Sequence, residues 1–403
     1  MRTLEDYTDI VGIDIIGDIH KKTRKLLGKR VVHVNSTNLG GGVAEILSSL
    51  VPLMNDIGLS AGWRVLHGNP DFFNITKKFH NGLQGDPVHF TRNKERIYIQ
   101  TNIDFAAYTH LSHDCIIIHD PQPLPMIKFY KKAQPWVWRC HVDFSNPDKT
   151  LWDFLSPFIL RYDLMLLSHE SYKKHDLPVE QRIIVPAIDP ITPKNMDITD
   201  SETCKYLRKF GVKTDKPYIV QVSRFDKWKD PEGVIKVWAR VKEEVDCRLV
   251  LCGNIATDDP EGGKLFQDVE KAVKKYSAND DDIILLLLEN NYLVNALQRK
   301  AAVVIQKSIK EGFCLAVTEA MWKGTPVVAS NVGGIPIQVK DGINGFLLEP
   351  DDEEGFADRT IKLLKDKEMA KEMGKQGKEI TRKNFLITRL LSDYLDLLTY
   401  LWS

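Results

Sequence analysis

Short runs of apolar residues alternate along this chain with longer segments in which apolar residues recur every three or four positions. The first run, 30–35, is followed by a glycine-rich turn, a helical pattern over 43–55 and a second apolar run at 63–66. This order of strand, turn, helix and strand predicts a parallel β-α-β unit. Later strands of the same half are predicted at 115–118 and 164–167.

The same pattern restarts after a stretch rich in proline and aspartate, residues 186–200. A helix is predicted over 231–241, and strands at 217–222, 247–252, 283–288 and 303–305. Continuous runs of isoleucine, valine and leucine are typical of parallel strands covered on both faces. The sequence therefore predicts the α/β class, as two doubly wound Rossmann-like domains, with a ligand in the cleft at the carboxyl ends of both sets of strands.

The length of 403 residues is too great for one ordinary hydrophobic core, which agrees with a division into domains. We expect an N-terminal domain over 1–195, a C-terminal domain over 196–380 and a terminal segment over 381–403. Residues 385–402 of that segment follow an amphipathic helical pattern. We expect this helix to pack across the domain boundary.

Composition excludes several classes of partner. The 55 basic and 55 acidic residues cancel, so neither nucleic acid nor an anionic membrane is favoured. The longest strongly apolar run, 283–288, is far too short to span a bilayer, and the acidic start at 1–6 shows no signal-peptide pattern. Six scattered cysteines form no zinc or disulfide pattern, which favours a reducing cytoplasm.

The segment from Glu311 to Glu319 carries the most informative candidate chemistry. A Gly-Phe step follows Glu311, and Glu319 lies in a helical run that Gly324 ends before an apolar strand. A glycine-rich start leaves N–H groups at the positive end of the helix dipole, which suits phosphate. Because the carboxylates suit hydroxyl groups, a nucleotide or a sugar phosphate is indicated. The alternative is a helix with two solvated glutamates.

Two further patterns suit a diphosphate. Arg224 and Lys229 follow the first strand of the second half, where two cations can stabilise the charge on a departing diphosphate. The alternative is a charged surface turn, because acidic residues stand beside this pair. Gly40, Gly41 and Gly42 follow the first strand of the first half and allow close approach of the backbone, although a triple glycine is often only a flexible turn.

Polar residues also follow two later strands of the first half. Asp120 and Gln122 come after 115–118, where a carboxylate at a strand end suits sugar hydroxyls. The alternative is a capped turn forced by neighbouring prolines.

The next strand-like segment ends at His141, which lies among Arg139 and Asp143 with Trp136 and Trp138 nearby. A lone histidine is more often structural. The two tryptophans are candidates for the core or for sugar platforms, with the core favoured for at least one of them.

The region from 306 to 348 resembles the retaining glycosyltransferases of family 4, which have the GT-B fold. The matching segments, in order, are Ser308, Glu311-Gly312-Phe313, Glu319-Ala320, 324–329, Gly333-Gly334-Ile335-Pro336 and 342–347. The resemblance extends over most of the chain, including the glycine loop at 40–42 and the turn at 223–225. It implies an acceptor-binding N-terminal domain and a C-terminal domain that binds a nucleotide sugar.

Residue roles follow from this resemblance. Arg224 and Lys229 match the pair that grips the donor diphosphate, and His141 matches an active-site histidine of related transferases. Glu319 matches the glutamate that binds ribose hydroxyls, and Glu311 the one that contacts the transferred sugar. The implied catalytic residues are Asp120, His141, Glu311, Arg224 and Lys229. The implied substrate-binding residues are Gly40, Gly41, Gly42, Gln122, Arg139, Asp143, Gly312, Phe313, Cys314, Leu315 and Glu319.

The segments 119–124, 138–141, 306–308 and 333–339 are most similar to the branch of trehalose glycosyltransferring synthases and retaining trehalose phosphorylases. Ile337 supports this branch, because the wider family usually has an acidic residue there. The resemblance implies a retaining enzyme that reversibly transfers an α-glucosyl unit between NDP-glucose and glucose, forming or cleaving α,α-trehalose. The alternatives are trehalose phosphorolysis, a transferase with another acceptor sugar, and a nucleotide-sugar sensor without catalysis.

We expect the site to require no metal or other cofactor. No Asp-x-Asp pair stands at a strand end, and Asp258-Asp259 and Asp280-Asp281-Asp282 are interpreted as solvated loops. The cations and backbone amides would neutralise the diphosphate, so Mg²⁺ is expected at most as a counter-ion of the nucleotide. The expected partners are ADP-, UDP- or GDP-glucose and glucose or trehalose, with a homodimer left open.

Overall fold

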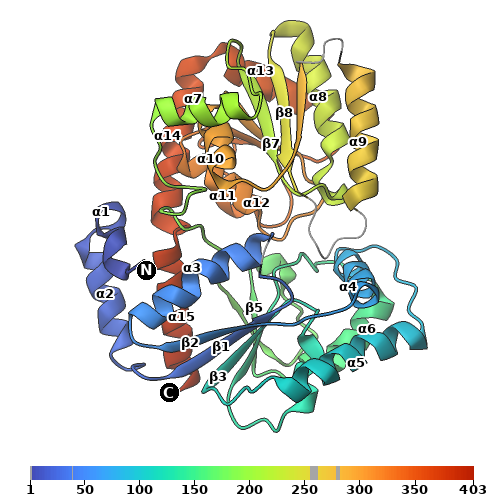
Figure 1. The fold of residues 1–403 in the computed structure, drawn as a ribbon, viewed down its shortest axis with the longest axis vertical. Helices are drawn as coiled ribbons and strands as arrows, with labels where there is room; N and C mark the ends of the chain where they lie inside the picture. The colour runs from blue at the N-terminus through green and yellow to red at the C-terminus, as the bar shows by residue number, and fades with distance from the viewer. Residues whose placement is uncertain (1, 39, 255–261, 278–281) are drawn as a thin grey trace. The chain divides into compact units, whose positions relative to one another are not determined.

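A computed structural model describes residues 2–38, 40–254, 262–277 and 282–403. They form two compact units (Figure 1). The first comprises Met1–Ala187 and Ile387–Ser403, and the second Ile188–Ala256 and Glu261–Leu386. The interpretation of Asp258, Asp259, Asp280 and Asp281 as solvated loops lies outside the described residues. For Asp282 it is wrong, because this residue is 6% exposed and its carboxylate lies 3.0 Å from Nζ of Lys242.

The first unit is built on a six-stranded parallel sheet in the order β2-β1-β3-β4-β5-β6. Its strands are β1 Arg30–Asn35, β2 Ser60–Val65, β3 Cys115–His119, β4 Trp136–Arg139, β5 Leu164–Leu167 and β6 Glu180–Ile183. Every residue of β3, β4 and β5 is buried, as expected for continuous apolar runs covered on both faces.

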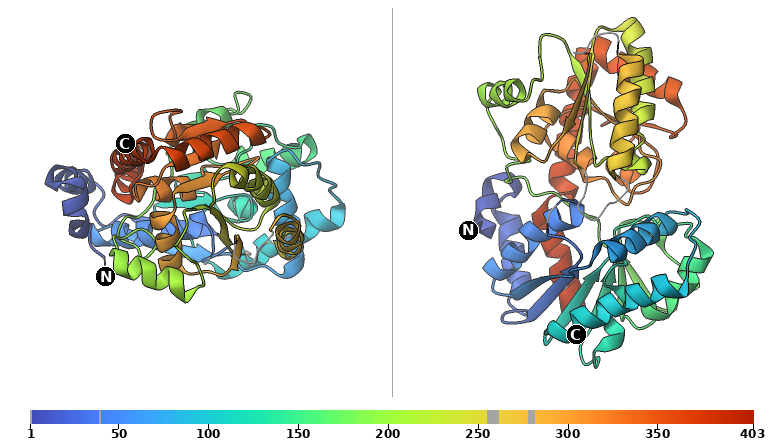
Figure 2. Two further views of the ribbon diagram at one scale, coloured as in Figure 1. Left: turned by 90° about the horizontal axis from the view of Figure 1, so that it is seen from above. Right: turned by 45° about the vertical axis from the view of Figure 1, so that its right-hand side comes forward.

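Two groups of helices lie on opposite sides of this unit (Figures 1 and 2). The helical segments are η1 Leu4–Tyr7, α1 Thr8–Val11, α2 Ile13–Thr23, α3 Gly42–Asp56, α4 Pro70–Leu83, α5 Arg92–Tyr108, η2 Leu124–Phe129, α6 Lys149–Ile159, η3 Glu170–Tyr172 and α15 Ile387–Leu401. On one side α4 contacts α5 and α6 around a core that contains Phe79, Tyr98 and Leu151. On the other, α15 contacts α2 and α3.

The second unit repeats this plan with the parallel strand order β12-β11-β10-β7-β8-β9. Its strands are β7 Tyr218–Val222, β8 Arg248–Gly253, β9 Ile283–Leu287, β10 Val303–Gln306, β11 Val327–Ser330 and β12 Phe346–Leu348. Its helical segments are α7 Asp200–Lys209, η4 Lys227–Lys229, α8 Pro231–Glu244, α9 Gly262–Tyr276, α10 Asn291–Lys300, α11 Leu315–Trp322, α12 Ile335–Gln338, α13 Glu353–Lys365 and α14 Lys367–Asn384.

Both faces of the second sheet carry a hydrophobic core. Val220 belongs to the cluster under α7, α10 and α11, whereas its neighbour Ile219 belongs to the cluster under α8, α9 and α13. Successive strand residues point to opposite faces, so these two clusters show that helices cover both sides. The predicted pair of doubly wound α/β domains is confirmed.

The helices predicted at 43–55, 231–241 and 385–402 correspond to α3, α8 and α15. α15 follows the whole second unit in sequence yet belongs to the first, where Nζ of Lys22 on α2 lies 2.5 Å from the carboxylate of Asp396. Its expected packing across the domain boundary stays a prediction. Across the described residues, each helix is too short or too polar to cross a membrane.

The strand order of each unit reverses beside its first strand. β1 lies between β2 and β3, and β7 lies between β8 and β10. At such switch points the neighbouring loops diverge and leave a crevice at the carboxyl ends of the strands. Gly40 and Asp120 follow β1 and β3, while Arg224 and Glu311 follow β7 and β10. These four residues therefore lie at the switch points of their own units, whereas Arg139, His141 and Asp143 lie at the end of the next strand, β4.

One tight contact in the second unit predicts a sensitive glycine. A Cβ on Gly374 of α14 would lie 1.9 Å from the carbonyl oxygen of Gly324, which itself has φ +76°. We expect Gly374→Ala to destabilise the protein by about 1–3 kcal/mol, because backbone must move to admit the methyl group. Urea unfolding midpoints measure this change. The control, Gly263→Ala in α9, meets nothing within 4 Å and is expected to leave the midpoint unchanged or slightly higher; equal midpoints for both variants would contradict the contact.

Candidate active site

A buried ion pair joins the loops that follow β7 and β10. Nζ of Lys229 lies 2.5 Å from Oε1 of Glu311, and the side chains are 16% and 7% exposed. Oγ of Ser308 donates to the same carboxylate oxygen at 3.2 Å. Burial opposes the charge on Lys229, but the carboxylate of Glu311 outweighs it and raises the lysine pKa. The structure thus brings together a cation and a carboxylate that stand 82 positions apart.

The turn that carries Lys229 is held by its own hydrogen bonds. The Asp226 carboxylate caps η4 by accepting the N–H of Trp228 at 3.0 Å, and Nε2 of Gln221 donates to the carbonyl of Lys229 at 3.0 Å. Arg224 lies in the same turn, with Nη2 3.9 Å from Asp226 and 32% of its side chain exposed. Arg224 is therefore accessible, whereas Lys229 is mostly enclosed.

The start of α11 is a constrained turn. Cys314, the N-cap residue, has φ +75°, a left-handed conformation that costs a residue other than glycine about 1–2 kcal/mol. Nε2 of Gln338 donates to the carbonyl of Phe313, which holds the turn. Gly334 lies so close that a Cβ there would meet the carbonyl oxygen of Gly312 at 2.7 Å. Helix geometry leaves the first N–H groups of α11 without the usual partner four residues earlier. That of Val317 donates instead to the carbonyl of Cys314 at 3.2 Å.

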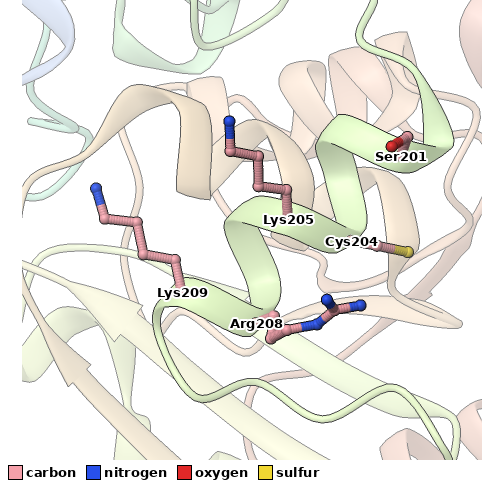
Figure 3. A pocket seen from close by; sticks show the side chains of 5 residues that line it. All are labelled: Ser201, Cys204, Lys205, Arg208 and Lys209. Carbon is pink, nitrogen blue, oxygen red and sulfur yellow. The ribbon is translucent and has the colours of Figure 1, made fainter.

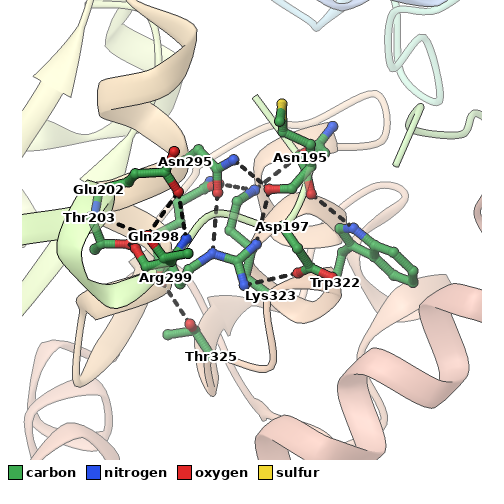
Figure 4. A network of polar contacts seen from close by, with 12 residues as sticks. Asn195, Asp197, Glu202, Thr203, Asn295, Gln298, Arg299, Trp322, Lys323 and Thr325 are labelled. Atoms are coloured by element: carbon green, nitrogen blue, oxygen red, sulfur yellow. Dashed lines mark hydrogen bonds and ion pairs between the residues drawn. The ribbon is translucent and has the colours of Figure 1, made fainter. Parts of the chain in front are cut away.

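Glu319 lies inside the second unit and is 2% exposed. Its Oε1 is 3.1 Å from Nζ of Lys194, a residue of the segment that precedes α7. Figure 4 shows the neighbouring network, in which Nζ of Lys323 donates to side-chain oxygens of Asn195 and Gln298, each at 2.9 Å. The ribose role of Glu319 stays a prediction, and Lys194 is a contact that the sequence did not indicate.

In the first unit, Asp120 and His141 lie together. Asp120 directly follows β3 with φ +63°, and its Oδ1 accepts the backbone N–H of His141 at 2.7 Å. Its carbonyl accepts Nε1 of Trp138 at 3.0 Å. Both Trp136 and Trp138 are fully buried in the core, which answers the open question about these two side chains.

Three histidine rings form a chain beside Asp120. Nδ1 of His119 lies 2.9 Å from Nε2 of His141, and Nε2 of His119 lies 3.0 Å from Nδ1 of His33. Burial lowers the pKa of His33 to about 3. Burial, with the charge of Arg139 and the adjoining rings, also holds the pKa of His119 and of His141 well below the usual value. The three rings are therefore neutral near pH 7.

Arg139 lies opposite His119 in the register of β3 with β4 and is 1% exposed. Among the described residues, its Nε and Nη1 have no hydrogen-bond partner, and neither has Oε1 of Gln122. Burial lowers the pKa of the guanidinium. Buried polar groups are normally hydrogen-bonded, so these atoms favour a site for a polar ligand. The carboxylate of Asp143 instead accepts the N–H and the hydroxyl of Ser145 at 2.9 and 2.7 Å.

The glycine loop leads from β1 into α3. Gly40 and Gly41 have φ of +66° and +142°, and Gly42 begins the helix. A Cβ on Gly41 would meet nothing within 4 Å, so backbone conformation rather than crowding accounts for glycine there. Leu39 lies outside the described residues.

A pocket of about 380 Å³ lies along α7 in the second unit (Figure 3). It is lined by Ser201, Cys204, Lys205, Arg208 and Lys209. None of the predicted site residues of this unit lines it, so it is a feature separate from the pair of Lys229 and Glu311.

Known proteins are similar to this chain over nearly its whole length. Residues 33–174 match the family described as the N-terminal domain of trehalose synthase, and residues 204–380 match the glycosyl transferases group 1. Trehalose synthase from Thermococcus litoralis is 46% identical over 403 residues, which cover 98% of this chain and 97% of that protein. Trehalose phosphorylase from Grifola frondosa is 28% identical over 91% of this chain and 56% of its own length.

A solved structure shows the same fold. Sucrose-phosphate synthase from Thermosynechococcus elongatus matches 93% of this chain and 99% of its own, with a TM-score of 0.75 and 17% identity. The GT-B fold that the sequence predicted is confirmed.

The buried histidines predict how stability depends on pH. A histidine whose pKa is lower in the folded protein than the usual 6.5 binds protons more readily when unfolded. Its contribution to stability is thus present above about pH 6.5 and is lost as the pH falls toward about 3, at roughly 1.4 kcal/mol per pH unit for each such ring. We expect His33→Asn to make this slope shallower by about that amount.

Urea unfolding of both proteins at a series of pH values between 7.5 and 5 measures the slope. The control is His175→Asn, which removes an exposed histidine from the same unit and is expected to keep the wild-type slope. Equal slopes for wild type and His33→Asn would contradict the assignment of a buried neutral ring.

Proposed function

Because this chain belongs to the trehalose synthase family of glycosyltransferases, we propose that it reversibly transfers an α-glucosyl unit between a nucleoside diphosphate and glucose, forming or cleaving α,α-trehalose. The second unit binds the nucleotide sugar and the first binds the acceptor glucose. The anomeric configuration of the transferred sugar is retained.

The ion pair of Lys229 and Glu311 is the observation that carries this proposal. A nucleotide sugar presents phosphates and sugar hydroxyls a few bonds apart, so its site needs a cation and a carboxylate side by side. The two side chains meet at 2.5 Å at the switch point between β7 and β10. Lys229 suits the phosphate nearest the sugar, and Glu311 suits the sugar hydroxyls.

The chemistry in this proposal is electrostatic. Departure of the nucleoside diphosphate leaves negative charge on its phosphates, and Arg224, Lys229 and the amides at the start of α11 neutralise that charge without proton transfer. In the part of the chain that the structure describes, no group of three or more His, Cys, Asp or Glu side chains is arranged to hold a metal. A site that needs no metal remains part of the proposal, with Mg²⁺ at most a counter-ion of the nucleotide.

We also propose that the acceptor attacks the same face that the diphosphate leaves, as the family resemblance implies. The departing phosphate takes the acceptor's proton while an oxocarbenium-like ion pair forms, so no protein side chain forms a bond to the sugar. The enzyme then contributes position and charge stabilisation rather than covalent catalysis.

The proposed site for the acceptor glucose is supported by polar groups of the first unit that can form hydrogen bonds with a neutral sugar. The carboxylate of Asp120 is held by the backbone of His141, and Arg139 carries buried N–H groups that lack partners among the described residues. Hydroxyl groups both donate and accept hydrogen bonds, so glucose can pair with carboxylate and guanidinium together. Gln122 and the glycine loop complete the proposed contacts.

Dependence on a nucleoside diphosphate is favoured over phosphorolysis by Glu319. We propose that this carboxylate binds the ribose of the nucleotide, a role that phosphorolysis with inorganic phosphate would not need. Glu319 is enclosed on α11 and paired with Lys194, a placement that suits a nucleotide's ribose one helical turn beyond the phosphate site. A cytoplasmic location is also proposed, since all six cysteines are free.

The direct test is release of glucose from trehalose by purified protein, with ADP, UDP, GDP or inorganic phosphate added separately. We expect release only with a nucleoside diphosphate, together with the matching NDP-glucose in equal amount. Release with phosphate alone, yielding glucose 1-phosphate, would replace this proposal with a phosphorylase.

Removal of one phosphate-side cation should act on the transition state. We expect Arg224→Gln to lower kcat about 10²- to 10³-fold with a smaller change in KM for NDP-glucose, because charge on the leaving group grows during the reaction. The control is Lys227→Gln, which removes an exposed cation from the same turn and should leave kcat within about twofold. A change confined to KM would make Arg224 a ground-state binding residue.

A further inference from the structure

The chain of three histidines joins the core of the first unit to its proposed sugar site. His33 lies on β1, His119 ends β3, and His141 follows β4. The two hydrogen bonds between their rings measure 3.0 and 2.9 Å. His33 and His119 are at most 1% exposed, whereas the His141 side chain is only partly buried. One end of the chain is therefore closed and the other reaches the surface of the unit.

The surroundings keep all three rings uncharged. The guanidinium of Arg139 is a fixed positive charge beside His119 and His141, and burial opposes a second charge there. The His33 ring lies edge-on to the ring of Tyr394, with centroids 5.8 Å apart. Each neutral ring carries one N–H and one bare nitrogen.

The middle ring couples the two hydrogen bonds. His119 uses both of its nitrogens, so it must donate through one and accept through the other. Both hydrogen bonds therefore run in the same direction along the row of three rings. If His33 donates to His119 and His119 donates to His141, the proton of His141 is at Nδ1. If both bonds run the other way, the proton of His141 is at Nε2.

The closed end selects between these arrangements. Nε2 of His33 has no hydrogen-bond partner among the described residues. If His141 carried its proton at Nε2, that buried nitrogen of His33 would be an orphaned N–H donor, and such donors are rarer in folded proteins than orphaned acceptors. The other arrangement leaves a bare nitrogen at the closed end, so it is the more stable one.

We propose that His33 and His119 are positioning residues that hold His141 with its proton at Nδ1, so that it donates a hydrogen bond to a hydroxyl oxygen of the sugar beside Asp120. The identity of that sugar rests on the proposed function, but the state of the ring does not. Asp120 then supplies an acceptor and His141 a donor, a complementary pair for a hydroxyl group. The hydrogen bond to His119 uses Nε2 of His141, so Nδ1 is the ring nitrogen that remains for a ligand.

Two substitutions at His33 separate polarity from packing. His33→Met places a thioether that accepts weakly and cannot donate, so it favours the reversed chain with the His141 proton at Nε2. His33→Asn places an amide nitrogen at the δ position and can still donate to His119. Ile117→Val, opposite His33 in the register of β1 with β3, is the control for a small change in the same part of the core.

The readout is the set of two-bond ¹H–¹⁵N correlations of the histidine rings at pH 7.5, with the His141 signals identified by their loss in His141→Gln. We expect Nδ1–H on His141 in wild type, His33→Asn and Ile117→Val, and Nε2–H in His33→Met. Trehalose cleavage with a nucleoside diphosphate should show kcat/KM lowered about two- to tenfold in His33→Met alone, the loss of one neutral hydrogen bond.

Three results would overturn the inference: Nε2–H on His141 in wild type, an unchanged ring in His33→Met, or a reversed ring with unchanged kcat/KM. A wild-type protein with Nδ1–H on His141 but no turnover of trehalose would contradict the proposed function while supporting the assignment of the ring.

Discussion

The site depends on one constraint: a parallel sheet covered on both faces can place polar chemistry only where its strands end. In the second unit β7 and β10 are neighbours, so loops far apart in sequence meet and Lys229 reaches Glu311. In the first unit β1, β3 and β4 are neighbours, which brings His33, His119 and His141 into one line. The apolar strands supply the rigidity, and the order of the strands decides which polar residues meet.

The two units differ in how their buried ionisable side chains are paired. In the second, Lys229 pairs with Glu311, Lys194 with Glu319, and Lys307 with Asp230. Breaking a buried pair is costly, so a charged ligand must replace the partner that it displaces. In the first unit the buried histidines are neutral, and Arg139 has no ion-pair partner among the described residues. The paired charges of the second unit suit a charged nucleotide sugar, and the neutral rings of the first unit suit an uncharged sugar.

The strands and the pair of doubly wound units were predictable because continuous valine, isoleucine and leucine runs have few other uses. The switch-point positions of Glu311 and Arg224 followed from the same pattern together with the family resemblance. His33 was read only as a strand residue, although a histidine between Val32 and Val34 is an unusual polar position. Its partners depend on the register of β1 with β3, and its orphaned nitrogen depends on how α15 covers it, neither of which local sequence encodes. Lys194 was missed for the same reason, because its contact with Glu319 is set by the path of the connector.

α15 gives the molecule an unusual order of construction. The helix completes the first unit, covering β1 with Tyr394 and contacting α2 and α3, yet it is encoded after the whole of the second unit. Domains generally fold as they emerge from the ribosome, N-terminal part first. Here the sheet of the first unit is made early, and the face that α2 and α3 share with α15 stays incompletely covered while roughly two hundred further residues are translated. The second unit is thus the first that can finish folding, and the earliest-made part of the chain is the last to be closed.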